Sequence, residues 1–197
     1  MMKSIIVTSL VVLAGLNYSS GGTITGTVKA RGVKNSADAV IYIDKIPSRT
    51  FPAPKEHALM DQKNLRFVPH VLPVLLGTTV DFLNSDDVLH NVFSPDKCAE
   101  KFNLGSWPKG HTKSYTFKEP GCPATLLCNV HPEMQGYVVV LETPYYAVSA
   151  ADGSYTIPDV PPGKYTLKIW HEKLKPQEVS VEVPDKKSVT VDFEIHK

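Results

Sequence analysis

The segment from Cys128 to Met134 reads Cys-Asn-Val-His-Pro-Glu-Met, and its Cys128, His131 and Met134 side chains can all bind a metal ion. His90, further upstream, adds a second imidazole. Copper accepts thiolate and imidazole ligands in trigonal sites, where a long, weak bond to a thioether completes the coordination. These four residues therefore predict a site for one mononuclear copper ion.

The spacing of these ligands limits the local structure. Ligands at positions i, i+3 and i+6 converge only where the chain curls at the end of a strand, so His90 must come from a neighbouring strand or loop. Pro132 fixes the backbone φ angle and removes one N–H donor, which we expect to stiffen the curl. Cys128 is expected to form the short thiolate bond and Met134 the axial contact.

Other interpretations exist for the same residues. Taken singly, Cys128 is more typical of a buried thiol or a disulfide partner, and Met134 of core packing. A structural zinc site on His90, Cys128 and His131 is a further alternative. The methionine argues against zinc, which is bound by nitrogen, oxygen and thiolate ligands.

The first 20 residues resemble a secretory signal. Lys3 precedes an apolar run over residues 5–16, and the small residues 19–22 follow it, as in a signal peptide with its cleavage region. The run has roughly 12 residues, whereas a membrane-spanning helix needs roughly 20. We therefore expect residues 1–20 to be a signal peptide and the protein to be periplasmic or otherwise exported, without membrane insertion after cleavage; an uncleaved anchor is the alternative.

The charge balance points to no particular partner. The chain has a formal net charge of +1, and removal of residues 1–20 would take away Lys3 and no acid. A nucleic-acid partner would require a basic face, so none is expected. The sequence also lacks a nucleophile elbow, a His-Glu-x-x-His zinc motif and a second set of copper ligands, so we do not expect an enzyme.

The composition predicts an all-β fold. Sixteen prolines and short apolar stretches bounded by Gly, Pro, Asn and Asp are typical of strands joined by loops. The region between His90 and Lys109 lacks a strand pattern and is expected to be a loop or short helix. Strands are predicted over residues 65–68, 79–83, 113–117, 136–141, 154–157, 165–170, 178–183 and 188–193.

The strands after the ligand segment form a second block. Val179, Val181 and Val183 alternate with polar residues, which predicts a strand with one packed face and one solvated face. Turn signals at Asp152-Gly153 and at residues 161–163 separate the first strands of this block. It is expected to be a separate small sandwich.

Residues 56–142 resemble the cupredoxins, the plastocyanin and amicyanin superfamily. The short spacing of the final ligands is more similar to amicyanin than to plastocyanin. The resemblance implies a Greek-key β-sandwich, one type 1 (blue) copper ion, and a role for Asn91 in tying the His90 segment to the cysteine loop. The motifs that carry it are Phe67-Val68-Pro69, Gly77-Thr78-Thr79-Val80, Asn84-Ser85-Asp86-Asp87, His90-Asn91-Val92 and the segment from Cys128 to Met134.

Residues 143–197 resemble the transthyretin-like or carboxypeptidase-regulatory-like β-sandwich, an immunoglobulin-like fold. The resemblance rests on residues 152–155 and 160–167. The stretch 22–50 is similar to the opening strands of the same sandwich, in which case the copper domain would be inserted in it. The competing arrangement adds these strands to the cupredoxin.

Cys98 and Cys122 remain once Cys128 is assigned to copper. In an oxidising compartment they are expected to form a disulfide. Two free thiols, or a further metal site with His111, are the alternatives.

Two functions from different classes follow. The first is an exported electron carrier that cycles between Cu(I) and Cu(II) and exchanges single electrons with redox partner proteins through His131. The second is a copper-sequestering or copper-delivery protein whose added sandwich docks a partner or a glycan. Metal transfer without redox coupling would distinguish the second from the first.

Overall fold

The computed structural model describes residues 21–96, 101–121 and 123–197, so the predicted signal segment 1–20 lies outside the described residues. The described ranges contain strands, turns and loops but no helix, and hence no helix that could cross a membrane. The strands are β1 (Gly22–Ala30), β2 (Val40–Ile43), β3 (Ala58–Gln62), β4 (Phe67–Val68), β5 (Val71–Leu75), β6 (Thr79–Asn84), β7 (His90–Ser94), β8 (Phe102–Trp107), β9 (Thr112–Thr116), β10 (Pro123–Leu127), β11 (Gln135–Leu141), β12 (Tyr146–Val148), β13 (Ser154–Val160), β14 (Gly163–His171), β15 (Leu174–Val183), β16 (Ser188–Thr190) and β17 (Phe193–Ile195).

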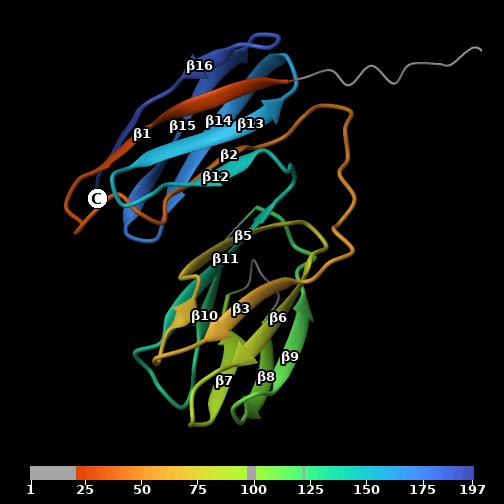
Figure 1. Cartoon of the computed structure of the whole chain (residues 1–197), viewed down its shortest axis with the longest axis vertical. Helices are drawn as coiled ribbons and strands as arrows, with labels where there is room; N and C mark the ends of the chain where they lie inside the picture. Colours follow the sequence, from red (N-terminus) through yellow and green to blue (C-terminus); the bar gives the residue numbers. More distant parts are fainter. Residues whose placement is uncertain (1–20, 97–100, 122) are drawn as a thin grey trace, which may run out of the picture.

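Strands β3 to β11 form one sandwich, which we call the central sandwich (Figure 1). One sheet has the order β4-β3-β6-β9 and the other has the order β5-β11-β10-β7-β8. Every second residue of β6 is buried, as expected for a strand with one face on a core. The two sheets enclose a core that includes Met60, Phe67, Val80, Phe82, Val92, Trp107, Phe117, Leu126 and Val138.

The remaining strands form a second sandwich from both ends of the described chain, which we call the terminal sandwich. Its sheets have the orders β13-β1-β16, with β17 also paired to β1, and β12-β2-β14-β15. The N-terminal strand β1 pairs antiparallel with β13, and β2 pairs antiparallel with β12 and β14. Strands β1 and β2 therefore lie in the sandwich built by the C-terminal strands, and the central sandwich is inserted between β2 and β12.

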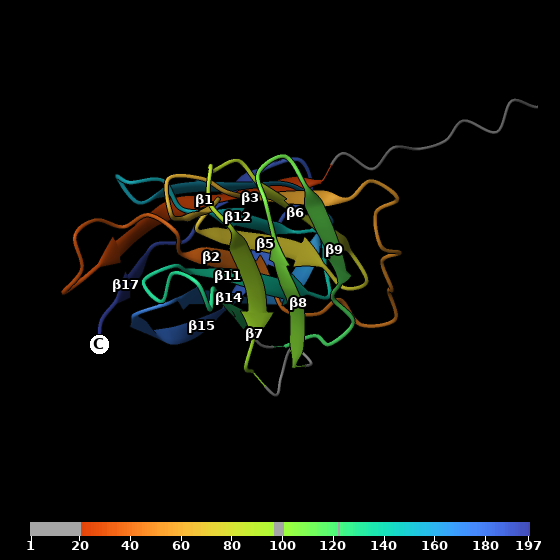
Figure 2. The ribbon, with the colours of Figure 1, turned by 90° about the horizontal axis from the view of Figure 1, so that it is seen from below.

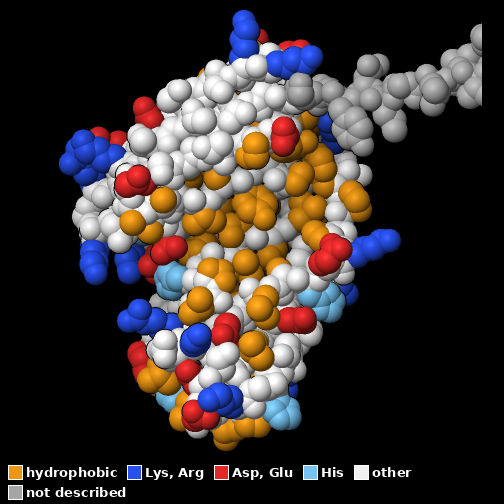
Figure 3. All heavy atoms as spheres, viewed as in Figure 1, with side chains coloured by type: hydrophobic (Ala, Val, Ile, Leu, Met, Phe, Trp, Pro, Cys, Tyr) orange, Lys and Arg blue, Asp and Glu red, His pale blue; other side chains and the backbone are white. Residues whose placement is uncertain are grey.

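An apolar junction joins the two sandwiches. The outward faces of β5 and β11 contribute Val71, Val139 and Leu141, and Val40 of β2 packs against them. The rings of Tyr137 and Trp170 meet edge to face with centroids 5.3 Å apart. Figure 2 shows the sandwiches stacked along the line of sight, and Figure 3 shows hydrophobic side chains gathered in a hollow where they meet.

Polar contacts close one side of this junction. His70 Nε2 lies 3.2 Å from Glu172 Oε1, and the His70 ring packs on the edge of Tyr137. Burial, together with the charge of Glu172, raises the pKa of Tyr137 to about 12. The junction thus combines a packed aromatic pair with a polar contact between the sandwiches.

The region between His90 and Lys109 corrects the sequence prediction. It contains the strands β7 and β8, which pair antiparallel, where a loop or short helix was expected. In β8, Phe102 and Leu104 are half-buried while Asn103 is exposed, so buried and exposed side chains alternate at the start of the strand. The strand was missed because Asn and Gly within it have low β-propensity. Pairing with β7, which no local pattern shows, stabilises this edge strand.

We predict that Gly26→Ala destabilises the terminal sandwich. A Cβ atom at this position of β1 would lie 1.8 Å from the carbonyl oxygen of Val191, so the backbone must shift. Overpacking of this kind costs about 1–3 kcal/mol. Urea unfolding measures the change, with Lys29→Ala, an exposed position on the same strand, as the control; equal midpoints for the two variants would contradict the strand placement.

Candidate metal centre

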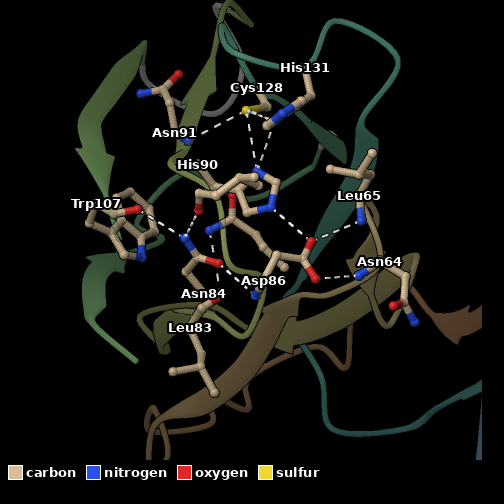
Figure 4. A network of polar contacts seen from close by, with 12 residues as sticks. Asn64, Leu65, Leu83, Asn84, Asp86, His90, Asn91, Trp107, Cys128 and His131 are labelled. Carbon is tan, nitrogen blue, oxygen red and sulfur yellow. Dashed lines mark hydrogen bonds and ion pairs between the residues drawn. The ribbon is translucent and has the colours of Figure 1, made fainter. Parts of the chain in front are cut away.

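Three of the predicted ligands converge at one end of the central sandwich. His90 begins β7, Cys128 directly follows β10, and His131 lies in the loop between β10 and β11. The Sγ atom of Cys128 lies 3.9 Å from His90 Nδ1 and 4.0 Å from His131 Nδ1, and the two Nδ1 atoms are 3.1 Å apart. Figure 4 shows both rings directed at the sulfur atom.

The protonation of His90 follows from its second contact. His90 Nε2 lies 2.9 Å from the Asp86 carboxylate, so the ring proton belongs on Nε2 and the Nδ1 lone pair faces His131 and Cys128. His90 and Cys128 are buried, and His131 is half-buried. One sulfur and two imidazole nitrogens this close together in a largely buried site form a donor set that one cation can share.

Met134 lies at the end of the same curl. Its N–H donates a hydrogen bond of 3.0 Å to the carbonyl oxygen of His131, which closes the turn that the ligand spacing requires. Its side chain is buried in the same core cluster as Cys128. Pro132 is exposed in the loop, so the N–H that proline lacks costs the structure no buried hydrogen bond.

Asn91 connects the two ligand segments. Its backbone N–H points at Cys128 Sγ over 3.4 Å, and its side-chain Oδ1 accepts a hydrogen bond of 3.3 Å from the Asn129 N–H. Its Nδ2 donates to Asn103 Oδ1 and to the Gly105 carbonyl, both at 2.9 Å. A buried side chain thus holds the cysteine loop, β7 and β8 in one arrangement.

Asp86 is a functional residue that the sequence reasoning did not assign. Burial alone would raise its pKa, but hydrogen bonds from the Leu65 N–H, His90 and the Asn64 N–H outweigh it and hold the pKa of Asp86 below its ordinary value. Asn84 Oδ1 accepts from the Asp86 N–H over 2.9 Å and fixes the loop. The signal in the sequence was an acid four residues before a predicted ligand, which places a carboxylate within reach of the imidazole.

Several other predicted residues lie elsewhere. Cys98 and Cys122, the predicted disulfide partners, lie outside the described residues. Among the histidines that the sequence did not assign to copper, His57 contacts Asp81 over 2.9 Å and His70 contacts Glu172. We find one group of three or more His, Cys, Asp or Glu side chains close enough together to bind a metal ion within the described ranges. It consists of His90, Cys128 and His131.

The donor set fits the chemistry of copper. One thiolate and two imidazoles with a methionine at the end of the loop is the composition of a trigonal copper site. Zinc in structural sites is usually held by four ligands drawn from cysteine, histidine and carboxylates, and the described cluster offers three. The site is therefore that of one type 1 copper ion.

Comparison with protein families supports this assignment. Residues 55–141 match the copper binding proteins of the plastocyanin/azurin family, and residues 133–196 match the carboxypeptidase regulatory-like domain. Both resemblances drawn from the sequence are thereby confirmed. The two matched segments overlap over β11, which the structure places in a sheet of the central sandwich.

Solved structures of copper proteins are similar to part of the chain. A copper-containing nitrite reductase from Thermus scotoductus matches 51% of this chain and 25% of its own, at 24% identity and a TM-score of 0.43. A purple cupredoxin from Nitrosopumilus maritimus matches 42% of this chain and 98% of its own, at 28% identity and a TM-score of 0.38. A mutant amicyanin in the Cu(I) form matches 52% of this chain and 98% of its own, at 27% identity and a TM-score of 0.41. A search of curated proteins gave no match.

We predict that Asn91→Ala loosens the cysteine loop. The substitution removes the hydrogen bonds of Asn91 to the Asn129 N–H and to the Gly105 carbonyl, and each lost hydrogen bond costs about 0.5–1.5 kcal/mol. The free energy of unfolding of the metal-free protein should fall by at least that amount. Asn129→Ala is the matched control, because its side chain is exposed and its backbone N–H is retained; a loss as large as in Asn91→Ala would contradict the assignment.

Proposed function

We propose that this protein is an exported type 1 copper protein that carries single electrons between redox partners. The observation that carries the proposal is the convergence of Cys128 Sγ and two Nδ1 atoms within 4.8 Å in the buried end of a sandwich. Copper bound there would supply a one-electron couple between Cu(I) and Cu(II). Contacts with neighbouring residues hold the ligand side chains in fixed positions.

Rigidity of the ligands supports electron transfer over ligand exchange. His90 is fixed through Asp86, and the cysteine loop is fixed through Asn91 and the His131–Met134 turn. Because each ligand is held by the protein, gain or loss of one electron requires little movement. A site that releases copper readily would need at least one ligand that is free to swing away.

The surface around His131 suits brief encounters with a partner. Exposed hydrophobic side chains precede two of the ligands in the chain: Val88 at 43% and Leu89 at 52% exposure come before His90, and Val130 at 45% comes before His131. Leu65, at 41% exposure, is hydrogen-bonded through its N–H to Asp86, which contacts His90. The loop between β10 and β11 lies at the end of the central sandwich that points away from the terminal sandwich (Figure 1). Small apolar interfaces of this kind fit transient redox complexes.

We further propose that the protein is not an enzyme and that its partners are redox proteins rather than nucleic acids. The formal net charge of +1 provides no strong electrostatic attraction for nucleic acid. The described residues contain one cluster of side chains that could bind a metal ion. An enzyme of the multicopper type would need a second set of copper ligands. The signal-like residues 1–20 support export.

A second candidate function is copper sequestration or delivery with docking through the terminal sandwich. The observation that favours it is a cavity of about 710 Å³ between the sandwiches. Tyr42 and Trp170 line it together with Asp44, Lys168 and Glu178, a mixture of aromatic and charged groups that suits a sugar or a peptide. In this case copper would pass to an acceptor protein without a change of oxidation state.

We predict that the mature protein binds one Cu(II) ion with an intense visible thiolate-to-copper absorption band. Cys128→Ala should abolish the band, because no other described cysteine lies at the site. Visible absorption and paramagnetic resonance spectra measure both outcomes. A weak, tetragonal copper signal that persists in Cys128→Ala would overturn the proposed site and favour sequestration.

We predict that Leu89→Lys slows electron self-exchange between Cu(I) and Cu(II) copies of the protein. A charge placed on the apolar surface must lose water when two copies meet, which disfavours the encounter. NMR line broadening in mixed oxidation states measures the rate, and Val179→Lys on the terminal sandwich is the control at 37% exposure. Equal rates in both variants would show that exchange uses another surface.

A further inference from the structure

The turn between β3 and β4 has an unusual backbone. Asn64 and Leu65 have φ angles of +54° and +56°, and the Lys63 N–H donates a 2.9 Å hydrogen bond to the Arg66 carbonyl across them. Positive φ at both central residues is the requirement of a type I′ turn, whose second position is ordinarily glycine. A leucine there is strained, because its side chain crowds the left-handed backbone.

The Asp86 carboxylate holds this turn in place. Its Oδ1 accepts the Asn64 N–H over 2.7 Å, and its Oδ2 accepts the Leu65 N–H over 2.9 Å. Successive N–H groups in a left-handed turn form a concave site for an anion, and Asp86 fills it. Figure 4 shows the carboxylate between the turn and the ring of His90.

The same carboxylate contacts the copper ligand. Oδ2 of Asp86 lies 2.9 Å from His90 Nε2, so the Leu65 N–H and the imidazole share one oxygen atom. A carboxylate on the outer nitrogen of a metal-binding histidine orients the ring and raises its basicity. Greater basicity favours Cu(II) over Cu(I), because the ion of higher charge gains more from a more basic ligand.

We infer that Asp86 is a positioning residue that couples the exposed Asn64–Leu65 turn to the copper ligand His90. The inference rests on the proposed copper function. When the turn is held, the Leu65 N–H draws charge from Oδ2 and weakens its pull on the imidazole. When the turn is displaced, the carboxylate acts on His90 alone and Cu(II) is favoured further. A redox partner that presses on Leu65, which is 41% exposed, would thus alter the copper site it is about to reduce or oxidise.

The first test compares Asp86→Asn with Asp87→Asn. Both remove one negative charge, but Asp87 is 85% exposed and contacts Lys109 instead of a ligand. Titration with Cu(II) and with Cu(I) gives the two affinities. We expect Asp86→Asn to lose about tenfold more affinity for Cu(II) than for Cu(I), which raises the reduction potential by about 59 mV for a one-electron couple. Equal affinity ratios in the two variants would overturn the inference.

The second test loosens the turn without touching Asp86. Leu65→Val places a β-branched side chain at a positive φ, which it tolerates poorly, whereas Leu65→Gly fits the turn. We expect Leu65→Val to lower the reduction potential and Leu65→Gly to leave it close to that of the unaltered protein. Identical potentials in the two variants would overturn the coupling.

A measurement on the metal-free protein separates this inference from the proposed function. Amide hydrogen exchange at Asn64 and Leu65 should be slow in the unaltered protein and faster in Asp86→Asn, with Asp87→Asn unchanged. Unchanged exchange in Asp86→Asn would overturn the inference. If the unaltered protein shows no thiolate-to-copper band, the proposed function fails; if it shows the band while the Asp86 and Asp87 variants behave alike, the coupling alone fails.

Discussion

The constraint on which this molecule depends is the convergence of one sulfur and two nitrogen lone pairs in a space with little water. The two Nδ1 atoms lie 3.1 Å apart. Because Asp86 holds the His90 proton at Nε2, the metal-free site needs a proton on His131 Nδ1 that is donated to His90, and a bound cation would take the place of that proton. Folding must therefore supply enough stability elsewhere to keep these donors together. Near the site, three features hold the ligands in place. They are the hydrogen bonds of Asp86, the hydrogen bonds of Asn91 and the packing of Met134 in the core.

The two-sheet core provides the wider support. His90 and Cys128 sit at the ends of β7 and β10, which are neighbours in one sheet, so the ladder between these strands sets the distance between the two ligands. The terminal sandwich packs on the outward faces of β5 and β11. Since β11 follows directly after Met134, the junction stabilises the strand that ends the ligand loop.

The sequence predicted the chemistry well because the ligands are few and their types are specific. Cys128, His131 and Met134 lie on one short loop, so their spacing alone described the curl that the structure contains. His90 could be recognised only with them. The all-β fold also followed from local patterns such as the alternation within β15. In that strand Val181 and Val183 are buried as predicted, whereas Val179 is exposed.

Other features depend on contacts between distant residues. β8 is stabilised by pairing with β7, and the alternation of its own residues is too weak to predict a strand. Asp86 acquires its role from Asn64, Leu65 and His90, which only the fold brings together. The left-handed turn was likewise hidden, because leucine at its second position suggested a strand over residues 65–68 rather than a type I′ turn.

The most direct test of the central claim is voltammetry of the copper-loaded mature protein. A rigid site that serves both oxidation states predicts a reversible one-electron wave, with the visible band restored in full after repeated reduction and reoxidation. Loss of copper on reduction, or an irreversible wave, would contradict the account, because the ligands would then be arranged to release the ion rather than to carry an electron.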